Sequence, residues 1–324
     1  MTTRPSPRDL EPWSVVSVRG LSRHYPGVAA LDGVDLELSA NRIYGLLGRN
    51  GAGKTTLLQI LLGQRFADAG EVRLFGRRPY EDDATLQRVC LVRESQTYPD
   101  HFAVRHVLKA ASMLYPFWDG DLADQLLKDF DLPPRRSMKK LSRGMLSAVG
   151  VVVGLASRAE LTLFDEPYLG LDAYARQLFY DRLLADFTER PRTVVLSTHL
   201  IDEVATLIEH VVLLHQGRVL IDSDTESLLD SAALVTGPED VVERFAADRR
   251  VLHRDDLGRV RRATVTGRMG RPGRAEAVAL GLAVEPVPLQ QLVVRSTGAA
   301  GAAPPRAAST DTPVELGAST GQQP

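Results

Sequence analysis

A glycine-rich loop between a short apolar run and a helix-like run constrains this chain more than any other stretch. Residues 46–56 read Leu-Leu-Gly-Arg-Asn-Gly-Ala-Gly-Lys-Thr-Thr and match the pattern GxxxxGK[ST]. Its glycines let successive backbone N–H groups turn toward anionic oxygens, and the following helix adds its positive end. The sequence therefore predicts a phosphate-binding loop made of Gly48, Arg49, Asn50, Gly51, Ala52, Gly53, Lys54, Thr55 and Thr56.

Two side chains of this loop have specific expected roles. Lys54 is placed to meet the β- and γ-phosphates of a nucleotide, and Thr55 to offer its hydroxyl to Mg²⁺. The competing interpretation is a glycine-rich turn with a stray lysine. The strand-like run before the loop and the helix-like run after it favour the phosphate site.

Composition excludes several other classes of protein. Hydrophobic residues make up 44% of the 324 residues and charged residues 25%, as in an ordinary globular protein of about two domains. Cys90 is the single cysteine, so an internal disulfide or a zinc framework is not expected. The longest apolar run, residues 148–156, is far shorter than the ~20 residues of a membrane-spanning helix. A net charge of −2 gives no overall attraction to nucleic acid.

The pattern along the chain predicts an α/β fold. Residues 34–38 alternate apolar and acidic residues, which is typical of a strand with one solvated face. Apolar residues then recur at helical spacing over 104–114 and 122–130. Apolar strands are expected at 161–167 and 193–199. The expected fold is a P-loop NTPase sheet with an N-terminal antiparallel β subdomain and a helical insert.

Two of these predicted strands deliver polar side chains at their ends. Asp165 and Glu166 end one strand, and in a doubly wound sheet such ends face the ligand crevice. Asp165 is expected to hold Mg²⁺ together with Thr55, and Glu166 to orient a water for attack on the γ-phosphoryl group. The alternative for the carboxylates is an acidic helix N-terminus after a buried strand. His199 ends the other strand, within reach of the γ-phosphate, although a lone histidine is more often structural.

These motifs stand in an order that resembles the ATP-binding subunit of ATP-binding cassette (ABC) transporters, over about residues 14–230. The stretch Leu-Ser-Arg-Gly-Met at 141–145 is similar to the signature loop of that family. Ser142 and the backbone N–H of Gly144 lie at the start of a predicted helix, where an anion site is expected. The resemblance implies that this site contacts the γ-phosphate of ATP held by a second copy, so that two ATP molecules lie between two subunits.

The resemblance also assigns residues outside the main motifs. Tyr25, which its residue type alone places in the core, becomes the aromatic that stacks on adenine, and Asp172 becomes the acidic residue of a loop that meets the second subunit. The glutamine loop of the family contributes a ligand to Mg²⁺, and Glu94 aligns best with that position, with Gln96 second. Tyr168 stands where the family usually has a small hydroxyl residue.

The sequence departs from the commonest signature at two positions. Arg143 and Met145 replace a glycine and a glutamine, while the Ser-x-Gly core is kept. We expect these changes to alter the properties of the anion site without abolishing it.

The implied function is ATP hydrolysis that drives transport, with export favoured, through separate membrane-spanning permease subunits. The second ATP-binding subunit makes either a homodimer or a heterodimer, and the expected location is the cytoplasmic face of the cell membrane. Two alternatives are a soluble ABC-type ATPase acting on nucleic acid or ribosomes, and a nucleotide-sensing interaction protein. Direct contact with nucleic acid is not expected. The sequence does not encode the identity of the transported substrate.

The predicted domain organisation has four parts. Residues 1–12 are expected to be a flexible lead, 13–230 the ATP-binding domain with its helical insert at about 97–157, 231–296 a small accessory domain, and 297–324 a disordered tail. The accessory part contains nine arginines and two aspartates between Arg249 and Arg274. A solvated face is the first interpretation of these arginines, and contact with anionic lipid headgroups is the second.

Overall fold

The central layer of the protein is a six-stranded sheet, in a computed structural model that describes residues 14–94 and 96–301. Its first five strands in space are parallel and the last pairs in the antiparallel direction. Three of the parallel strands are buried at every residue, which explains their nearly continuous apolar sequences. The spatial order is β5 (Val89–Arg93), β6 (Leu161–Asp165), β7 (Thr193–Thr198), β3 (Ile43–Leu47), β8 (His210–His215) and β9 (Arg218–Asp224).

A second, antiparallel sheet forms the N-terminal β subdomain, in the order β2 (Val28–Ser39), β1 (Ser14–Tyr25) and β4 (Ala69–Leu74). Its strand β2 buries Val34, Leu36 and Leu38 and exposes the residues between them, as the alternating sequence predicts. Helix α1 (Lys54–Leu61) shares one apolar core with both sheets. This arrangement confirms the predicted α/β fold with an antiparallel β subdomain.

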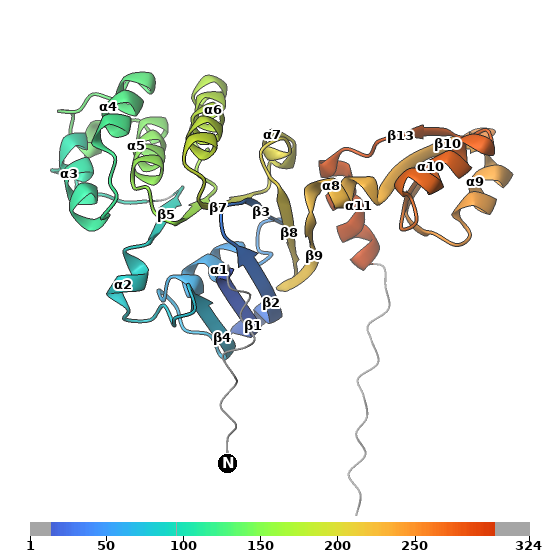
Figure 1. Ribbon diagram of the computed structural model, residues 1–324, viewed down its shortest axis with the longest axis horizontal. Helices are drawn as coiled ribbons and strands as arrows, with labels where there is room; N and C mark the ends of the chain where they lie inside the picture. Colours follow the sequence, from blue (N-terminus) through green and yellow to red (C-terminus); the bar gives the residue numbers. More distant parts are fainter. Residues whose placement is uncertain (1–13, 95, 302–324) are drawn as a thin grey trace, which may run out of the picture.

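A group of helices lies beside the edge of the central sheet at β5 (Figure 1). Helix α5 approaches this edge closely, because a Cβ on Gly154 would lie 2.6 Å from the ring of Phe164. The elements of this region are α2 (Asp83–Leu86), α3 (Val104–Leu114), α4 (Gly120–Asp129), α5 (Arg143–Ala156) and α6 (Ala173–Glu189), with a 3₁₀ turn at Met138–Lys140.

The C-terminal part has a four-stranded antiparallel sheet and a separate apolar core around Val235, Phe245 and Val265. Short helices α7 (Ile201–Val204) and α8 (Thr225–Asp230) precede it. Its strands lie in the spatial order β11 (Arg250–Leu257), β12 (Val260–Thr266), β10 (Ala232–Pro238) and β13 (Ala283–Glu285). Its helices are α9 (Glu239–Ala246), α10 (Gly270–Ala279) and α11 (Leu289–Gly301).

Helix α11 returns from the C-terminal part toward the central sheet and its helices (Figure 1). Leu289 and Val293 belong to the same buried cluster as Ile201 and Leu213, whereas Leu292 packs with β10. The helix therefore has one apolar face for each neighbour. It also corrects the predicted start of the tail at residue 297, because residues 297–301 continue the helix. The remaining tail, residues 302–324, and the predicted lead at 1–12 lie outside the described residues.

Carboxylates from neighbouring elements neutralise most of the arginine-rich stretch. Six of its nine arginines form ion pairs: Arg249, Arg254, Arg261, Arg262, Arg268 and Arg274. Most of their partners lie outside residues 249–274, as Glu243 and Glu276 do. This pairing favours a solvated face and gives no support to lipid contact. Within residues 14–94 and 96–301, none of the helices has the length and apolar character needed to span a bilayer.

Candidate functional site

The glycine-rich loop connects β3 to α1, and its glycines are required by geometry. Gly48, Gly51 and Gly53 have φ angles of 151°, 81° and 109°, which residues with a side chain rarely adopt. A Cβ on Gly48 would lie 2.5 Å from the carbonyl oxygen of Leu214, and one on Gly53 would lie 2.3 Å from that of Ala30. The curled loop that phosphate binding needs is thus built into the backbone.

Lys54 brings a buried positive charge into this loop. Its side chain is only 6% exposed, and its Nζ donates a hydrogen bond to the carbonyl oxygen of Gly48 at 2.7 Å. The same Nζ lies 3.6 Å from Oε1 of Glu166. A buried cation with so few partners is available to phosphate oxygens.

Thr55 and Asp165 meet from α1 and the end of β6. The Thr55 hydroxyl donates to Oδ2 of Asp165 at 2.9 Å, and Ser197 donates to Oδ1 at 2.7 Å. Asp165 is only 6% exposed. Sequence reasoning did not single out Ser197, although it is a polar residue near the end of the buried strand β7.

Glu166 and His199 also come together, at the ends of β6 and β7. Nδ1 of His199 lies 2.9 Å from Oε2 of Glu166, and the hydroxyl of Tyr168 donates to the same oxygen. That hydroxyl lies 2.6 Å from Oγ1 of Thr198, and burial raises the pKa of Tyr168 above its usual range. The other carboxylate oxygen, Oε1, is buried and accepts no hydrogen bond among the described residues.

Of these side chains, Lys54, Thr55, Glu166 and His199 line one open cavity of about 480 Å³. Tyr25 is one of its lining residues, and the guanidinium groups of Arg23 and Arg65 are 5.1 and 5.7 Å from the centre of the tyrosine ring. The predicted site residues in the lining are Tyr25, Arg49, Asn50, Gly51, Ala52, Gly53, Lys54, Thr55, Thr56, Glu94, Glu166 and His199.

The two candidates for the glutamine position differ in where they lie relative to the cavity. Glu94 lines the cavity, and its backbone N–H donates to the carbonyl oxygen of Asp165 at 3.1 Å. Gln96 is not among the lining residues, and its Oε1 is buried without a hydrogen bond to any described group. Of the two, Glu94 is the one beside the Thr55 and Asp165 pair.

The predicted signature residues do not line the cavity of their own chain. Ser142 caps α5, accepting a hydrogen bond from the backbone N–H of Met145 at 3.2 Å, and Asp172 caps α6 in the same way. Gly144 packs so tightly that a Cβ there would lie 2.6 Å from the carbonyl oxygen of Gly170. The signature helix and the loop after Glu166 are therefore packed against each other.

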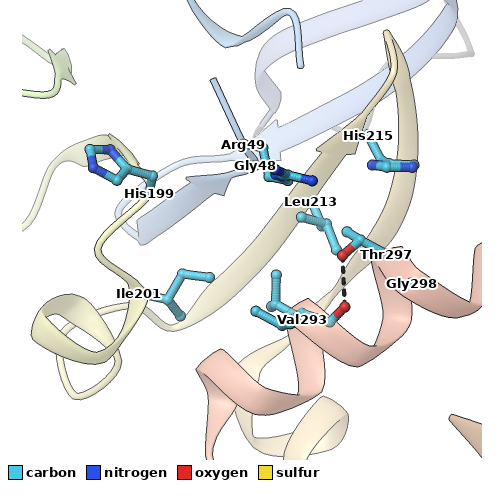
Figure 2. Close-up of a pocket in the computed structure, with 10 residues that line it drawn as sticks. Gly48, Arg49, His199, Ile201, Leu213, His215, Val293, Thr297 and Gly298 are labelled. Atoms are coloured by element: carbon cyan, nitrogen blue, oxygen red, sulfur yellow. Dashed lines mark hydrogen bonds between the residues drawn. The ribbon is translucent and has the colours of Figure 1, made fainter. Parts of the chain in front are cut away.

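A second cavity, of about 400 Å³, lies beside the first (Figure 2). Gly48 and Arg49 line it from the glycine-rich loop, His199 lines it from the end of β7, and Val293 and Thr297 line it from α11. Helix α11 thus reaches the flank of the phosphate-binding loop.

Sequence comparisons place the chain near ATP-binding proteins of transporters. A sequence model of the family described as ABC transporter matches residues 31–169. The ABC transporter ATP-binding protein YtrB of Bacillus subtilis (strain 168) is 25% identical over 214 residues, which cover 66% of this chain and 73% of YtrB. The daunorubicin/doxorubicin resistance ATP-binding protein DrrA of Streptomyces peucetius is 28% identical over 261 residues, covering 74% and 76%. A Nod factor export ATP-binding protein I of Cupriavidus metallidurans is 29% identical over 224 residues, covering 67% and 74%.

Solved structures share the fold of this region. An ATP-binding subunit of an ABC transporter superposes with a TM-score of 0.60 and 24% identity, covering 66% of this chain and 91% of that one. The dimeric, post-hydrolysis state of the ATP-binding cassette MJ0796, bound to ADP and Pi, has a TM-score of 0.57 and 23% identity, covering 65% and 98%. These likenesses extend over about two thirds of the chain.

Proposed function

Because this chain belongs to the family of ABC transporter ATP-binding subunits, we propose that it hydrolyses Mg²⁺-ATP to drive export through separate membrane-spanning subunits. The observation that carries the proposal is the convergence of Lys54, Glu166 and His199 on one cavity, beside the Thr55 and Asp165 pair. The names of two relatives, one for daunorubicin/doxorubicin resistance and one for Nod factor export, support export as the direction of transport.

Binding of ATP is expected to use the loop and Tyr25. The phosphates bind in the curled loop of residues 48–56. There Lys54 gives up its hydrogen bond to the Gly48 carbonyl and forms charge-assisted hydrogen bonds to phosphate oxygens. Tyr25, at the edge of the same cavity, offers its ring to adenine.

The donor set around Asp165 fits Mg²⁺. A hydroxyl and a carboxylate lie within 2.9 Å of each other, and Mg²⁺ usually binds one or two carboxylates together with substrate phosphates and waters. Thr55 and Asp165 would hold the ion, and Glu94 would add a second carboxylate. The ion supplies neutralisation of charge on the phosphates.

Glu166 and His199 provide the chemistry of hydrolysis in this proposal. Oε2 of Glu166 is occupied by hydrogen bonds, whereas Oε1, 3.6 Å from Nζ of Lys54, accepts no hydrogen bond from the described residues and can accept one from an attacking water. Lys54 and the loop N–H groups stabilise charge on the transferring phosphoryl group, and His199 stands ready to contact it.

A second copy of the subunit completes the site. Ser142, Gly144 and Asp172 lie outside the cavity of their own chain, so they are available to ATP held by a partner subunit. The ordered N-terminus of α5, capped by Ser142, is suited to a phosphate. Either a homodimer or a heterodimer satisfies this geometry.

The test combines turnover with recovery of the membrane partner. Purified protein should hydrolyse ATP in a Mg²⁺-dependent manner, and chain recovered from detergent-solubilised membranes of its own cell should carry a stoichiometric multi-span protein. Absence of ATPase activity from that recovered complex would contradict the enzymatic part. Active protein recovered only with nucleic acid or ribosomes would contradict transport.

A further inference from the structure

Tyr168 stands next to the reacting groups and is buried, with 3% of its side chain exposed. Its hydroxyl donates to Oε2 of Glu166 and lies 2.6 Å from Oγ1 of Thr198 and 3.5 Å from Nδ1 of His199. The tyrosine therefore contacts both strand ends, β6 and β7, that supply the polar groups of hydrolysis. No role is assigned to it by the mechanism above.

The two carboxylate oxygens of Glu166 have different surroundings. Oε2 is fixed by Tyr168 and His199, while Oε1 has no hydrogen-bond partner among the described residues and lies 3.6 Å from Nζ of Lys54. A carboxylate held at one oxygen can rotate little about its terminal bond. Its other oxygen keeps one direction.

Glu166 itself has a backbone conformation that needs support. Its φ angle is 52°, in the left-handed region that residues other than glycine seldom adopt. Such conformations cost about 1–3 kcal/mol and persist where surrounding contacts hold them. The hydroxyl of Tyr168 is one such contact, made two residues further along the same turn.

We propose that Tyr168 is a positioning residue for ATP hydrolysis, which fixes Oε2 of Glu166 so that Oε1 faces the attacking water. The inference rests on the proposed function, because it needs Glu166 to act on water. Tyr168 is not among the residues that line the cavity. It acts through Glu166 and through the shared contact with His199.

Substitution Tyr168→Phe removes the hydroxyl and keeps the buried ring. Thr198 retains a partner, since its Oγ1 also accepts the backbone N–H of Leu200 at 2.8 Å, so the fold should survive. We expect kcat for ATP to fall by about 10- to 100-fold, the usual effect of misplacing a catalytic group. KM for ATP and the Kd of ATP should stay within about twofold, because the phosphate loop is unchanged.

The matched control is Tyr180→Phe. Tyr180 is also buried and its hydroxyl also donates to a carboxylate, that of Glu203 at 3.3 Å, but this pair lies outside the cavity. The control should leave kcat unchanged. In a Glu166→Gln background, Tyr168→Phe should add no further loss, because the group that it positions is already disabled.

The outcomes separate this inference from the proposed function. If the native protein hydrolyses ATP and Tyr168→Phe keeps or raises kcat, the positioning role is overturned and the proposed function stands. If KM rises while kcat is kept, Tyr168 acts on binding and the inference is again overturned. If the native protein lacks ATPase activity altogether, the proposed function fails, and the positioning role fails with it.

Discussion

Arg143, the first residue of α5, forms an ion pair with Glu94, which follows β5. Both are positions at which the sequence is predicted to differ from the ABC family pattern: Arg143 stands where a glycine is usual, and Glu94 is the better candidate for the position of the glutamine. The two side chains at these positions contact each other, so each charged group has its partner within the same subunit. The signature helix and the predicted third Mg²⁺ ligand are thereby joined directly.

Arg143→Ala should lower the Mg²⁺ concentration that gives half-maximal ATPase activity. Without the guanidinium, the carboxylate of Glu94 is free for the ion. The shift should not exceed about fivefold, because the Arg143 side chain is 72% exposed and such pairs contribute at most about 1 kcal/mol. Arg88→Ala, which breaks an ion pair with Glu160 outside the cavity, is the control. An unchanged or raised Mg²⁺ requirement would show that the pair does not compete with the ion.

Glu94→Ala should raise the Mg²⁺ requirement, and Gln96→Ala should leave it nearly unchanged. The reason is position, since Glu94 lines the cavity and Gln96 does not. Titration of ATPase activity with Mg²⁺ measures both variants. The reverse result would make Gln96 the ligand and would move the glutamine loop by two residues.

Lys54→Ala should weaken ATP binding by about 10- to 100-fold, since hydrogen bonds to charged groups are worth about 1.5–3 kcal/mol. Turnover should be lost with it. Fluorescence titration with a nucleotide analogue measures the affinity, and Lys128→Ala on the exposed surface of α4 serves as the control. Full ATPase activity in Lys54→Ala protein would refute the assignment of the phosphate loop.

Glu166→Gln should hold ATP without hydrolysing it, because the binding contacts remain while the group that activates water is lost. A dimer with two trapped nucleotides should then accumulate. Gel filtration with light scattering, in ATP and Mg²⁺, detects it, and Lys54→Ala protein treated in the same way should stay monomeric. If Glu166→Gln protein elutes only as a monomer, the arrangement with a shared ATP site is wrong.

Leu289→Ala should destabilise the protein, because this side chain of α11 is 3% exposed within the core of the ATP-binding domain. Truncation of a buried leucine costs about 2–5 kcal/mol. Val294→Ala on the same helix, where the side chain is 59% exposed, should have little effect. Midpoints of urea denaturation compare the two. Equal midpoints would mean that α11 does not stabilise this contact.

The phosphate loop and the strand-end carboxylates were predictable because their geometry is local. Glycine at positive φ is a property of each residue, and parallel strands bring their carboxyl ends to one edge whatever else the chain does. The α/β fold followed from the same buried strands. Roles for the individual residues remain predictions, to be decided by the variants above.

The contacts that escaped prediction join distant parts of the sequence. Arg143 and Glu94 are 49 residues apart, and Tyr168 meets Thr198 across two strands, so no spacing rule could pair them. Residues 249–274 have a large excess of arginine over acidic residues, but many of the carboxylates that pair with these arginines, such as Glu243 and Glu276, lie outside that range in the sequence. Residues 297–301 looked structureless by composition, yet they continue a helix anchored by Leu289 and Val293.

Helix α11 also limits how the C-terminal part can move. The chain enters that part through α8, and α11 brings it back to pack against the ATP-binding domain, so the two bodies are fastened at two separate points. Any wide excursion has to pull Leu289 and Val293 into water. The C-terminal part is thus held close to the phosphate loop, because residues of α11 and residues of that loop line the same cavity.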